Sequence, residues 1–288
     1  MIFASYNIQY GFGLDGRYDL ERIAKGLEGA DVIALQEVTR GFARNGHADM
    51  PGAIGALFPD HFWVYGPACD IHVEAAPGQI SLPRGTRFQF GNMVLSRWPI
   101  LSVRTLLLPR SRTVDKINLQ RGATETVIAL PDGAVRVYSI HLDHVSGDER
   151  IAQLRYLNDR INAFVHEGAS LTGGAEFGLA ELPLPADYVV MGDFNMEPES
   201  PEYCAFAGSA DRFYGRTARI GTPVDAFAAL GAYGPESYSW MDPDDRGRRM
   251  HLDYCFVSCG LKDRLKSAFI DTDCQGSDHF PLRVEIGD

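Results

Sequence analysis

Short apolar runs, separated by turn residues, predict a chain that consists mainly of β-strands. Residues 1–10 alternate as a strand does, with Asn7 on one face and Tyr6 and Ile8 on the other. Turn signals such as Pro131-Asp132-Gly133 join runs that follow one another closely, which predicts mostly antiparallel pairing. Further strands are expected at 31–37, 88–96, 98–108, 122–130, 134–142, 188–192, 252–258, 265–270 and 282–286.

Two segments have the spacing of helices instead. Asp19 is the expected N-cap of one, with Leu20, Ile23 and Leu27 on its apolar face. The longest helix is expected at 148–166. No linker, charge block or internal repeat divides the chain, so a single domain over 1–288 is expected. The pattern predicts an α+β fold with two packed, mostly antiparallel sheets and helices outside them.

Polar residues lie inside, or directly after, several of the apolar runs. Buried carboxylates are costly unless they are paired or bound to a cation, so these residues indicate a metal-centred active site. In Asp193-Phe194-Asn195, period-2 geometry directs both polar side chains into a cleft and packs Phe194 behind them. Oxygen donors of this kind favour Mg²⁺ or Mn²⁺ over zinc. The residues concerned are Asn7, Glu37, Asp193, Asn195, Asp253, Asp278 and His279.

The order of these segments resembles the endonuclease/exonuclease/phosphatase superfamily. Its members include deoxyribonuclease-like nucleases, apurinic endonucleases, inositol polyphosphate phosphatases and neutral sphingomyelinases. The resemblance spans residues 1 to about 286, nearly the whole chain. It rests on Asn7, Glu37, His141, Asp193-Phe194-Asn195, Asp253 and Ser277-Asp278-His279, in that order. It implies a four-layer αββα sandwich and a metal-dependent cleavage of phosphoester bonds.

The resemblance also implies a role for each residue. Glu37 becomes the principal Mg²⁺ ligand, and Asp278 a ligand of the metal or of its water. His279 becomes the general base, or an acid that stabilises the phosphate, and Asp253 orients it. His141 donates to a non-bridging phosphate oxygen. Asn7, Asn195 and Asp193 serve the metal and the transition state, and Asp193 is an alternative to His279 for positioning the water.

Several motifs have simpler interpretations. Glu37 could form a structural salt bridge, and Asp193-Phe194-Asn195 could be an ordinary turn. His141-x-x-His144 has the look of a metal pair, but two strand positions three apart face opposite ways. Cys255 and Cys259 suggest zinc, yet buried structural thiols are the better interpretation in a probable strand.

The segment Gly11-Phe12-Gly13-Leu14-Asp15-Gly16 matches the fingerprint of dinucleotide-binding folds. The following helix begins at Asp19 rather than at the glycines, so its N-terminus would not meet a pyrophosphate. The next hundred or so residues form hairpins rather than βαβ repeats. The glycines are therefore expected to form a turn.

Composition narrows the class of protein. The 288 residues carry 27 basic and 38 acidic side chains, a net charge of −11, which disfavours a nuclease that grips long nucleic acid. No signal peptide is visible in this sequence, so none is expected, and no apolar run approaches the roughly 20 residues of a membrane span. The five cysteines are odd in number and scattered, which predicts reduced thiols in the cytoplasm.

Substrate contacts are expected from Asn92 and Arg121, where strands emerge from loops, and from Trp240. The segment from Trp240 to Arg249 resembles the aromatic and basic loop of apurinic endonucleases. The residues after His141 depart from those enzymes. Basic residues in loops near the cleft are expected to hold one or two phosphates; they are Arg84, Arg87, Arg110, Arg112 and Lys116.

The prediction is an Mg²⁺- or Mn²⁺-dependent hydrolase of a small or lipid-linked phosphoester. A DNA endonuclease or exonuclease of the apurinic type is the alternative, so nucleic acid is possible as a partner but not favoured. A catalytically inactive binding module is a remote third interpretation, because Glu37, Asp193 and His279 are all present. No obligate protein partner is evident from the sequence.

Overall fold

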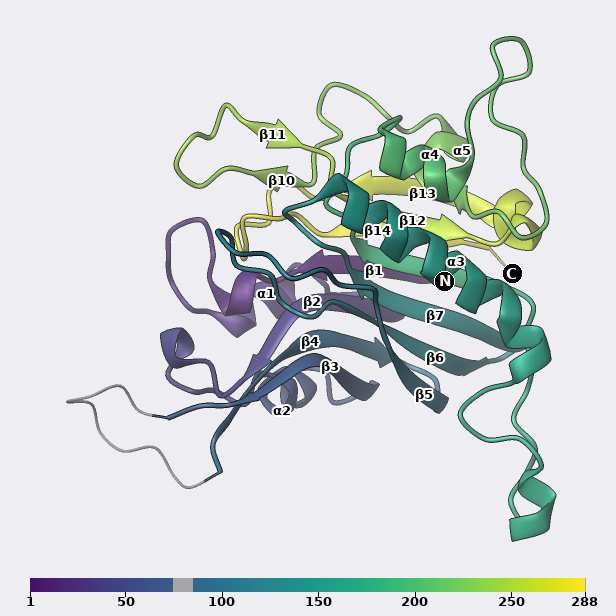
Figure 1. The fold of residues 1–288 in the computed structure, drawn as a ribbon, viewed down its shortest axis with the longest axis horizontal. Coiled ribbons are helices and arrows are strands. Elements are labelled where there is room, and N and C mark those ends of the chain that lie inside the picture. Colours follow the sequence, from purple (N-terminus) through teal and green to yellow (C-terminus); the bar gives the residue numbers. More distant parts are fainter. Residues whose placement is uncertain (75–84, 288) are drawn as a thin grey trace.

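Two sheets packed face to face form the centre of the computed structural model, which describes residues 1–74 and 85–287 (Figure 1). Within these residues each sheet has six strands. The first has the order β13 (Leu265–Ile270), β14 (Leu282–Ile286), β1 (Ile2–Asn7), β2 (Val32–Arg40), β4 (Arg87–Ser96) and β3 (Phe62–His72). The second has the order β5 (Ile100–Leu107), β6 (Gly122–Leu130), β7 (Gly133–His141), β8 (Tyr188–Asp193), β12 (Asp253–Val257) and β9 (Val224–Asp225).

Helices cover the outer face of each sheet. The helix α1 (Leu20–Lys25) begins at Asp19, whose carboxylate accepts a hydrogen bond from the backbone N–H of Arg22 at 3.0 Å, as expected for an N-cap. The long helix α3 (Gly147–Glu167) begins at Ser146 in the same way. The other elements are α2 (Met50–Leu57), α4 (Pro201–Ala207), α5 (Ala226–Leu230), the hairpin of β10 (Trp240–Met241) and β11 (Arg249–Met250), and 3₁₀ turns at Gln9–Gly11, Ala43–Asn45, Gly174–Phe177 and Cys259–Arg264.

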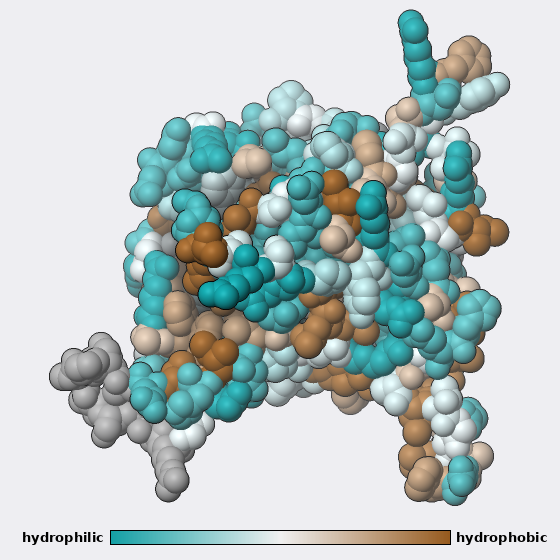
Figure 2. Space-filling view, in the orientation of Figure 1, coloured by the Kyte–Doolittle hydropathy of each residue, from teal (hydrophilic) through white to brown (hydrophobic). Residues whose placement is uncertain are grey.

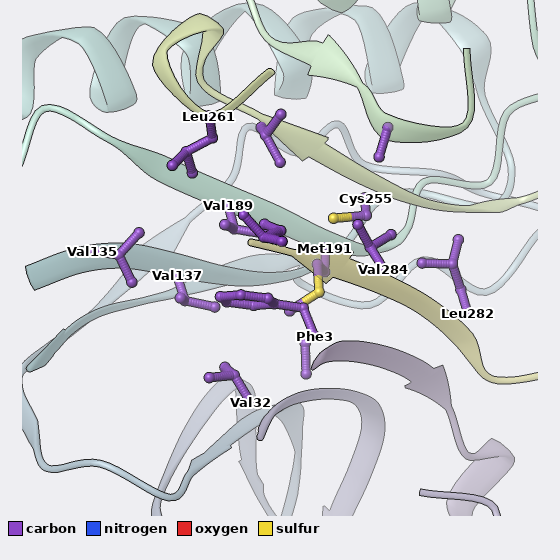
Figure 3. Close-up of a cluster of buried hydrophobic side chains, with 14 of the residues drawn as sticks. Phe3, Val32, Val135, Val137, Val189, Met191, Cys255, Leu261, Leu282 and Val284 are labelled. Carbon is purple, nitrogen blue, oxygen red and sulfur yellow. The ribbon is translucent and has the colours of Figure 1, made fainter. Parts of the chain in front are cut away.

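Three apolar clusters hold these layers together. Between the sheets lie buried side chains such as Phe3, Val137 and Met191, which Figure 3 shows in close-up. A second cluster joins the first sheet to α1 and α2, and a third joins the second sheet to α3 and α4. Each fully buried aliphatic or aromatic side chain contributes roughly 1.5–3 kcal/mol. The expected αββα sandwich is therefore confirmed.

The sequence placed most elements correctly but missed others. The first strand ends at Asn7 rather than at residue 10, because Gln9 and Tyr10 have φ of 41° and 54° and start a 3₁₀ turn. The strand β3 and the helices α2 and α4 were not expected from the pattern. The β3 side chains alternate little in burial, and the two helices are short. Their tertiary contacts outweigh their weak local signals.

The glycine-rich segment forms a turn, as expected. Gly16 donates its backbone N–H to Gly13, and Gly13 donates to Arg17. The helix that follows starts only at Leu20, several residues after the glycines.

All five cysteines are free thiols. None of the described helices combines the length and apolar character needed to span a bilayer.

The strand β8 passes so close to β7 that one of its positions accepts only glycine. Gly192 has a φ of +153°, and a Cβ on it would lie 2.0 Å from the carbonyl oxygen of Ile140. Gly133 has a similar φ of +141° but open space around it. A comparison of Gly192 with Gly133 therefore distinguishes the cost of backbone strain, which both positions share, from the cost of a steric clash, which only Gly192 has.

We predict that Gly192→Ala lowers the free energy of unfolding by about 1–3 kcal/mol more than Gly133→Ala does, which is the usual cost of overpacking. Urea unfolding followed by tryptophan fluorescence measures both. Equal losses in the two variants would show that β7 and β8 can separate without cost.

Candidate active site

The carboxyl ends of four strands meet at one end of the sandwich. β1 and β2 are parallel and place Asn7 beside Gln36, while β7 and β8 are parallel and place His141 beside Asp193. β12 runs antiparallel to β8 and begins at the same end, with Asp253 beside Asp193. In Figure 1 this end lies on the left, and the two termini lie on the right. Strand register thus gathers residues that are far apart in the chain.

His279 and Asp253 form a buried pair. Nδ1 of His279 lies 2.7 Å from Oδ2 of Asp253, so the ring donates this proton to the carboxylate and presents Nε2 to the cleft. Burial alone would lower the pKa of His279, but the charges of Asp253, Asp193 and Asp278 raise it to about 10. The neighbouring carboxylates therefore favour the protonated form of the ring.

Asn7 contacts three other polar groups of the candidate site. Its Nδ2 donates to Oδ2 of Asp193 at 2.9 Å and lies 3.4 Å from both Oε1 of Glu37 and Nε2 of His279. Its Oδ1 accepts a hydrogen bond from the backbone N–H of Gln9 at 3.1 Å. This contact fixes the orientation of the side-chain amide, with the oxygen toward Gln9 and the nitrogen toward the cleft. The buried amide therefore holds Glu37, Asp193 and His279 around one point.

Glu37 is directed into the same cleft by an irregularity in β2. The register with β4 shifts between Leu35 and Val38, and Glu37 has a left-handed φ of 60°. A β-bulge of this kind re-aims a side chain, and such strain is typical of functional sites. Oε2 of Glu37 is buried without a hydrogen-bond partner among the described residues. Burial and the charge of Asp278 raise the pKa of Glu37 to about 7.

Asp278 also lines the cleft, next to the β10–β11 hairpin. Its Oδ2 accepts a hydrogen bond from the indole Nε1 of Trp240 at 3.2 Å, and its Oδ1 accepts one from Ser277. A bridge between Trp240 and His279 attaches the hairpin to this segment. Trp240 therefore lines the cleft and also supports a carboxylate.

His141, Arg121 and His144 form a contiguous group on another wall. Nε2 of His141 lies 3.4 Å from Oδ2 of Asp193, and Nη1 of Arg121 lies 2.9–3.0 Å from both ring nitrogens of His141. Nη2 of Arg121 lies 2.9 Å from Nδ1 of His144. Burial, and then the charge of Arg121, lowers the pKa of His141 well below its usual value. The expectation that His141 and His144 face opposite ways was wrong, because the strand ends at His141.

Asn195 reaches the cleft, although not by strand alternation. β8 ends at Asp193, and Asn195 has a left-handed φ of 49°. Its backbone N–H donates to Oδ1 of Asp193 at 2.9 Å, and its side-chain amide donates to the carbonyl of Leu142. Phe194 is fully buried behind them, as expected. The segment is thus both a turn and part of the site.

Asn92 was expected to contact the substrate, but the structure does not bring it to the cleft. It lies in the middle of β4 rather than where a strand leaves a loop, and only 2% of it is exposed. Its Nδ2 donates to the carbonyls of Gly122 at 2.8 Å and Ser139 at 2.9 Å, both in the other sheet. The side chain joins the two sheets, so we correct its assignment from substrate contact to structural bridge.

Most of these groups line an open cleft of about 460 Å³, whereas Asn7 and Asp253 lie behind its lining and contact Asp193 and His279. Part of its wall is apolar, and its basic residues are Arg121, Arg150 and Arg248. Of the loop residues that were expected to hold phosphates, those that the structure describes do not line it. Arg87 pairs with Asp70, Arg110 donates to a backbone carbonyl, Arg112 and Lys116 are exposed, and Arg84 lies outside the described residues. The face of the molecule shown in Figure 2 is mostly hydrophilic, and its hydrophobic residues lie in small groups.

Two arrangements in this cleft could hold a metal ion. Asp193, Asp253 and His279 each offer an atom within 4.8 Å of the others, and they are the one such group among the described residues. Oδ2 of Asp253 already accepts from His279, but Oδ1 of Asp253 is buried without a hydrogen-bond partner among the described residues, as Oε2 of Glu37 is. Glu37 and Asp278 form the second arrangement, since the charge of Asp278 acts on Glu37 and raises its pKa. The cysteines contribute to no such group in this part of the chain, so the zinc interpretation has no support.

The sequence did not indicate Ser239 as a site residue. Its hydroxyl oxygen accepts the backbone N–H groups of Leu252 and Asp253, each at 2.8 Å, and its carbonyl accepts that of Phe280. It therefore holds the segments that carry Asp253 and His279 in one arrangement. A serine before a tryptophan has no distinctive signal, and only the fold shows its position.

Comparisons with known proteins agree with this geometry. Residues 4–279 match the model of the Endonuclease/Exonuclease/phosphatase family. An endonuclease/exonuclease/phosphatase from Beutenbergia cavernae is 20% identical over 100% of this chain and 72% of that one, with a TM-score of 0.65. A mannosyl-6-phosphatase from Bacteroides thetaiotaomicron is 17% identical over the whole of both chains (TM-score 0.63). TDP2 from Caenorhabditis elegans is 17% identical over 100% of this chain and 74% of that one (TM-score 0.63). No curated protein matches.

The new role of Asn92 is testable. We predict that Asn92→Ala lowers the free energy of unfolding by about 1–3 kcal/mol, because two buried carbonyls lose their donor. Asn162→Ala is the matched control. That amide also donates to two carbonyls, but at an exposed position, so its loss should stay within about 0.5 kcal/mol. An unchanged stability for Asn92→Ala would contradict the structural role.

Proposed function

The chain belongs to the endonuclease/exonuclease/phosphatase family, and we propose that it hydrolyses phosphoester bonds with the help of a divalent cation. The observation that carries this proposal is the meeting of two features in one cleft. One is the buried His279–Asp253 pair, and the other is the unpaired, buried oxygen of Glu37. A base and a site for a hard cation are what phosphoester hydrolysis needs.

Glu37 and Asp278 fit the cation best, and Asn7, Asp193 and Asn195 are further candidate ligands. The donor atoms are carboxylate and amide oxygens, which suit Mg²⁺ or Mn²⁺. The mutual repulsion of Glu37 and Asp278 is consistent with the raised pKa of Glu37, and it would be relieved by a positive charge. Once bound, such an ion neutralises the charge on the phosphate and on the departing oxygen.

His279 holds and moves the proton in the proposed reaction. Asp253 fixes the ring so that Nε2 faces the cleft, 3.6 Å from Asp193. His279 can accept a proton from water once the charges of Glu37 and Asp278 are neutralised, because fewer carboxylates then stabilise the imidazolium. Asp193, which lies between the rings of His141 and His279, is the alternative group for positioning the water.

Neutral His141 completes the arrangement from the other side. Arg121 can only donate, so one ring nitrogen of His141 accepts from it and the other carries the proton. Nε2 lies 3.4 Å from Oδ2 of Asp193, and in the tautomer that carries the proton on Nε2 this N–H would be available to a phosphate oxygen. Together with the amide of Asn7, it would stabilise negative charge in the transition state.

For the substrate, we propose a small or lipid-linked phosphoester. The net charge of −11 provides no long-range attraction for a polyanion. The cleft also has apolar lining from Ile117, Leu119, Met250 and Leu252, which suits an organic leaving group. The free thiols fit our further proposal of a reducing compartment such as the cytoplasm.

A DNA substrate is the second candidate, and one observation favours it. The guanidinium of Arg248 lies 5.7 Å from the centre of the Trp240 ring, at the side of the cleft. An aromatic ring and a cation in this arrangement can contact a nucleotide base and its phosphate.

The two substrate classes are distinguished by comparing kcat/KM on abasic duplex, plain duplex, bis-p-nitrophenyl phosphate, inositol phosphates and sphingomyelin at one ionic strength. A preference for abasic duplex above about tenfold, ~1.4 kcal/mol, would favour DNA.

We predict that excess EDTA abolishes hydrolysis and that Mg²⁺ or Mn²⁺ restores it, because the candidate ligands are oxygen donors. Glu37→Gln should raise the Mg²⁺ concentration needed for half-maximal activity. Full turnover in EDTA, or restoration by zinc alone, would exclude the proposed site.

We also predict that His279→Ala lowers kcat by about 10²–10⁴-fold, the usual effect of losing a general acid or base. Asp253→Asn should impair the same step, because the amide cannot hold the imidazole in the correct tautomer. Single-turnover rates and circular dichroism of each variant check the step and the fold. Near wild-type kcat in a folded His279→Ala protein would contradict the assignment.

A further inference from the structure

Arg121 is a buried cation without a carboxylate partner. Only 4% of the residue is exposed, and no salt bridge involves it among the residues that the structure describes. Its Nη atoms contact the imidazoles of His141 and His144, and its guanidinium lies 5.5 Å from the centre of the Phe90 ring. Its Nε is buried and has no hydrogen-bond partner in this part of the chain. Burying an unpaired charge is costly.

The other arginines of the cleft differ from Arg121. Arg150 is paired with Glu202 at 2.6 Å, and Arg248 lies 3.6 Å from Asp242 and is largely exposed. Arg121 is balanced only at longer range, mainly by Glu37, whose pKa its charge lowers. A cation bound to Glu37 would remove this balance. The guanidinium would then need an anion from outside the protein.

The contacts place Arg121 beside the catalytic groups rather than among them. Asp193 lies 3.6 Å from His279 and 3.4 Å from His141, whereas no described contact joins Arg121 to Asp193 or His279. Arg121 contacts His141 and then His144, which extends the row along the cleft wall. An anion bound to Arg121 would therefore lie next to the phosphate that is hydrolysed in the proposed reaction.

We propose that Arg121 and His144 form a second anion subsite, which binds a negatively charged group next to the scissile phosphate of the substrate. This inference rests on the proposed function and specifies its substrate class. Preferred substrates would carry two neighbouring anionic groups, as bisphosphates and phosphoanhydrides do. Phosphoesters with one anionic group would use only the catalytic half of the cleft.

The donors needed for such a ligand are present. A guanidinium has five N–H groups, and the contacts with His141 and His144 leave Nε–H and others free. Because Arg121 cannot accept, Nδ1 of His144 is the acceptor and its Nε2 carries the proton in the neutral ring. Burial and Arg121 lower the pKa of His144, which is consistent with that neutral form. The subsite thus offers a fixed cation and a neutral donor.

The test compares two ligands that the enzyme cannot hydrolyse. Calorimetry at a fixed free Mg²⁺ concentration measures the affinities of inorganic phosphate and of methylenebisphosphonate. We expect Arg121→Gln to reduce the preference of the protein for the bisphosphonate by at least about tenfold, with a smaller effect on phosphate. His144→Ala, at a half-exposed position, should reduce it by about threefold, as for one neutral hydrogen bond.

Arg155→Gln is the control, because it removes the same charge from an exposed position on α3 and should leave the preference unchanged. An equal loss of affinity for both ligands in Arg121→Gln would place Arg121 on the scissile phosphate and overturn the subsite. An unchanged preference in both site variants would overturn it as well. Hydrolysis of bis-p-nitrophenyl phosphate by the wild-type protein separates this failure from failure of the proposed function, since that substrate has no second anionic group.

Discussion

The hydrogen bond from Asn7 to Asp193 joins the two sheets at the point where the site is built. Asn7 ends β1 of the first sheet, and Asp193 ends β8 of the second. Both residues are almost fully buried, so neither could remain without a polar partner at reasonable cost. The bond therefore sets how the ends of the two sheets approach each other, and it brings Glu37 and His279 within reach of the same amide.

Further polar bridges behind this bond maintain the same spacing. Asn92 donates to two carbonyls of the opposite sheet, and Gln36 donates to the hydroxyl of Ser139 at 3.0 Å. Such bridges are unusual between sheets whose shared core is otherwise apolar. They keep the site end of the sandwich in a defined register, whereas apolar contacts alone tolerate small shifts.

The site also concentrates features that work against stability. Several carboxylates surround the imidazole of His279; they belong to Glu37, Asp193, Asp253 and Asp278. In addition, Glu37 and Asn195 have left-handed backbone conformations. On the other wall, Arg121 is buried without a carboxylate. Opposite charges thus face each other across the cleft without pairing directly. This arrangement is costly in the free protein, and under the proposed function a bound cation and an anionic ligand would offset that cost.

The sequence by itself determined the layered fold and most of the residues that meet in the cleft. Alternating and buried apolar runs indicated the strands, Asp19 indicated a helix start, and the polar residues at strand ends indicated the site. These are local signals in the sequence. They identify elements correctly because a buried position accepts only certain residue types. The tertiary structure alone decided that Asn92 bridges the sheets, that Ser239 holds the His279–Asp253 pair, and that Arg121 is buried without a carboxylate. Those roles depend on partners 13 to 47 residues away in the chain, and local sequence patterns do not indicate such contacts.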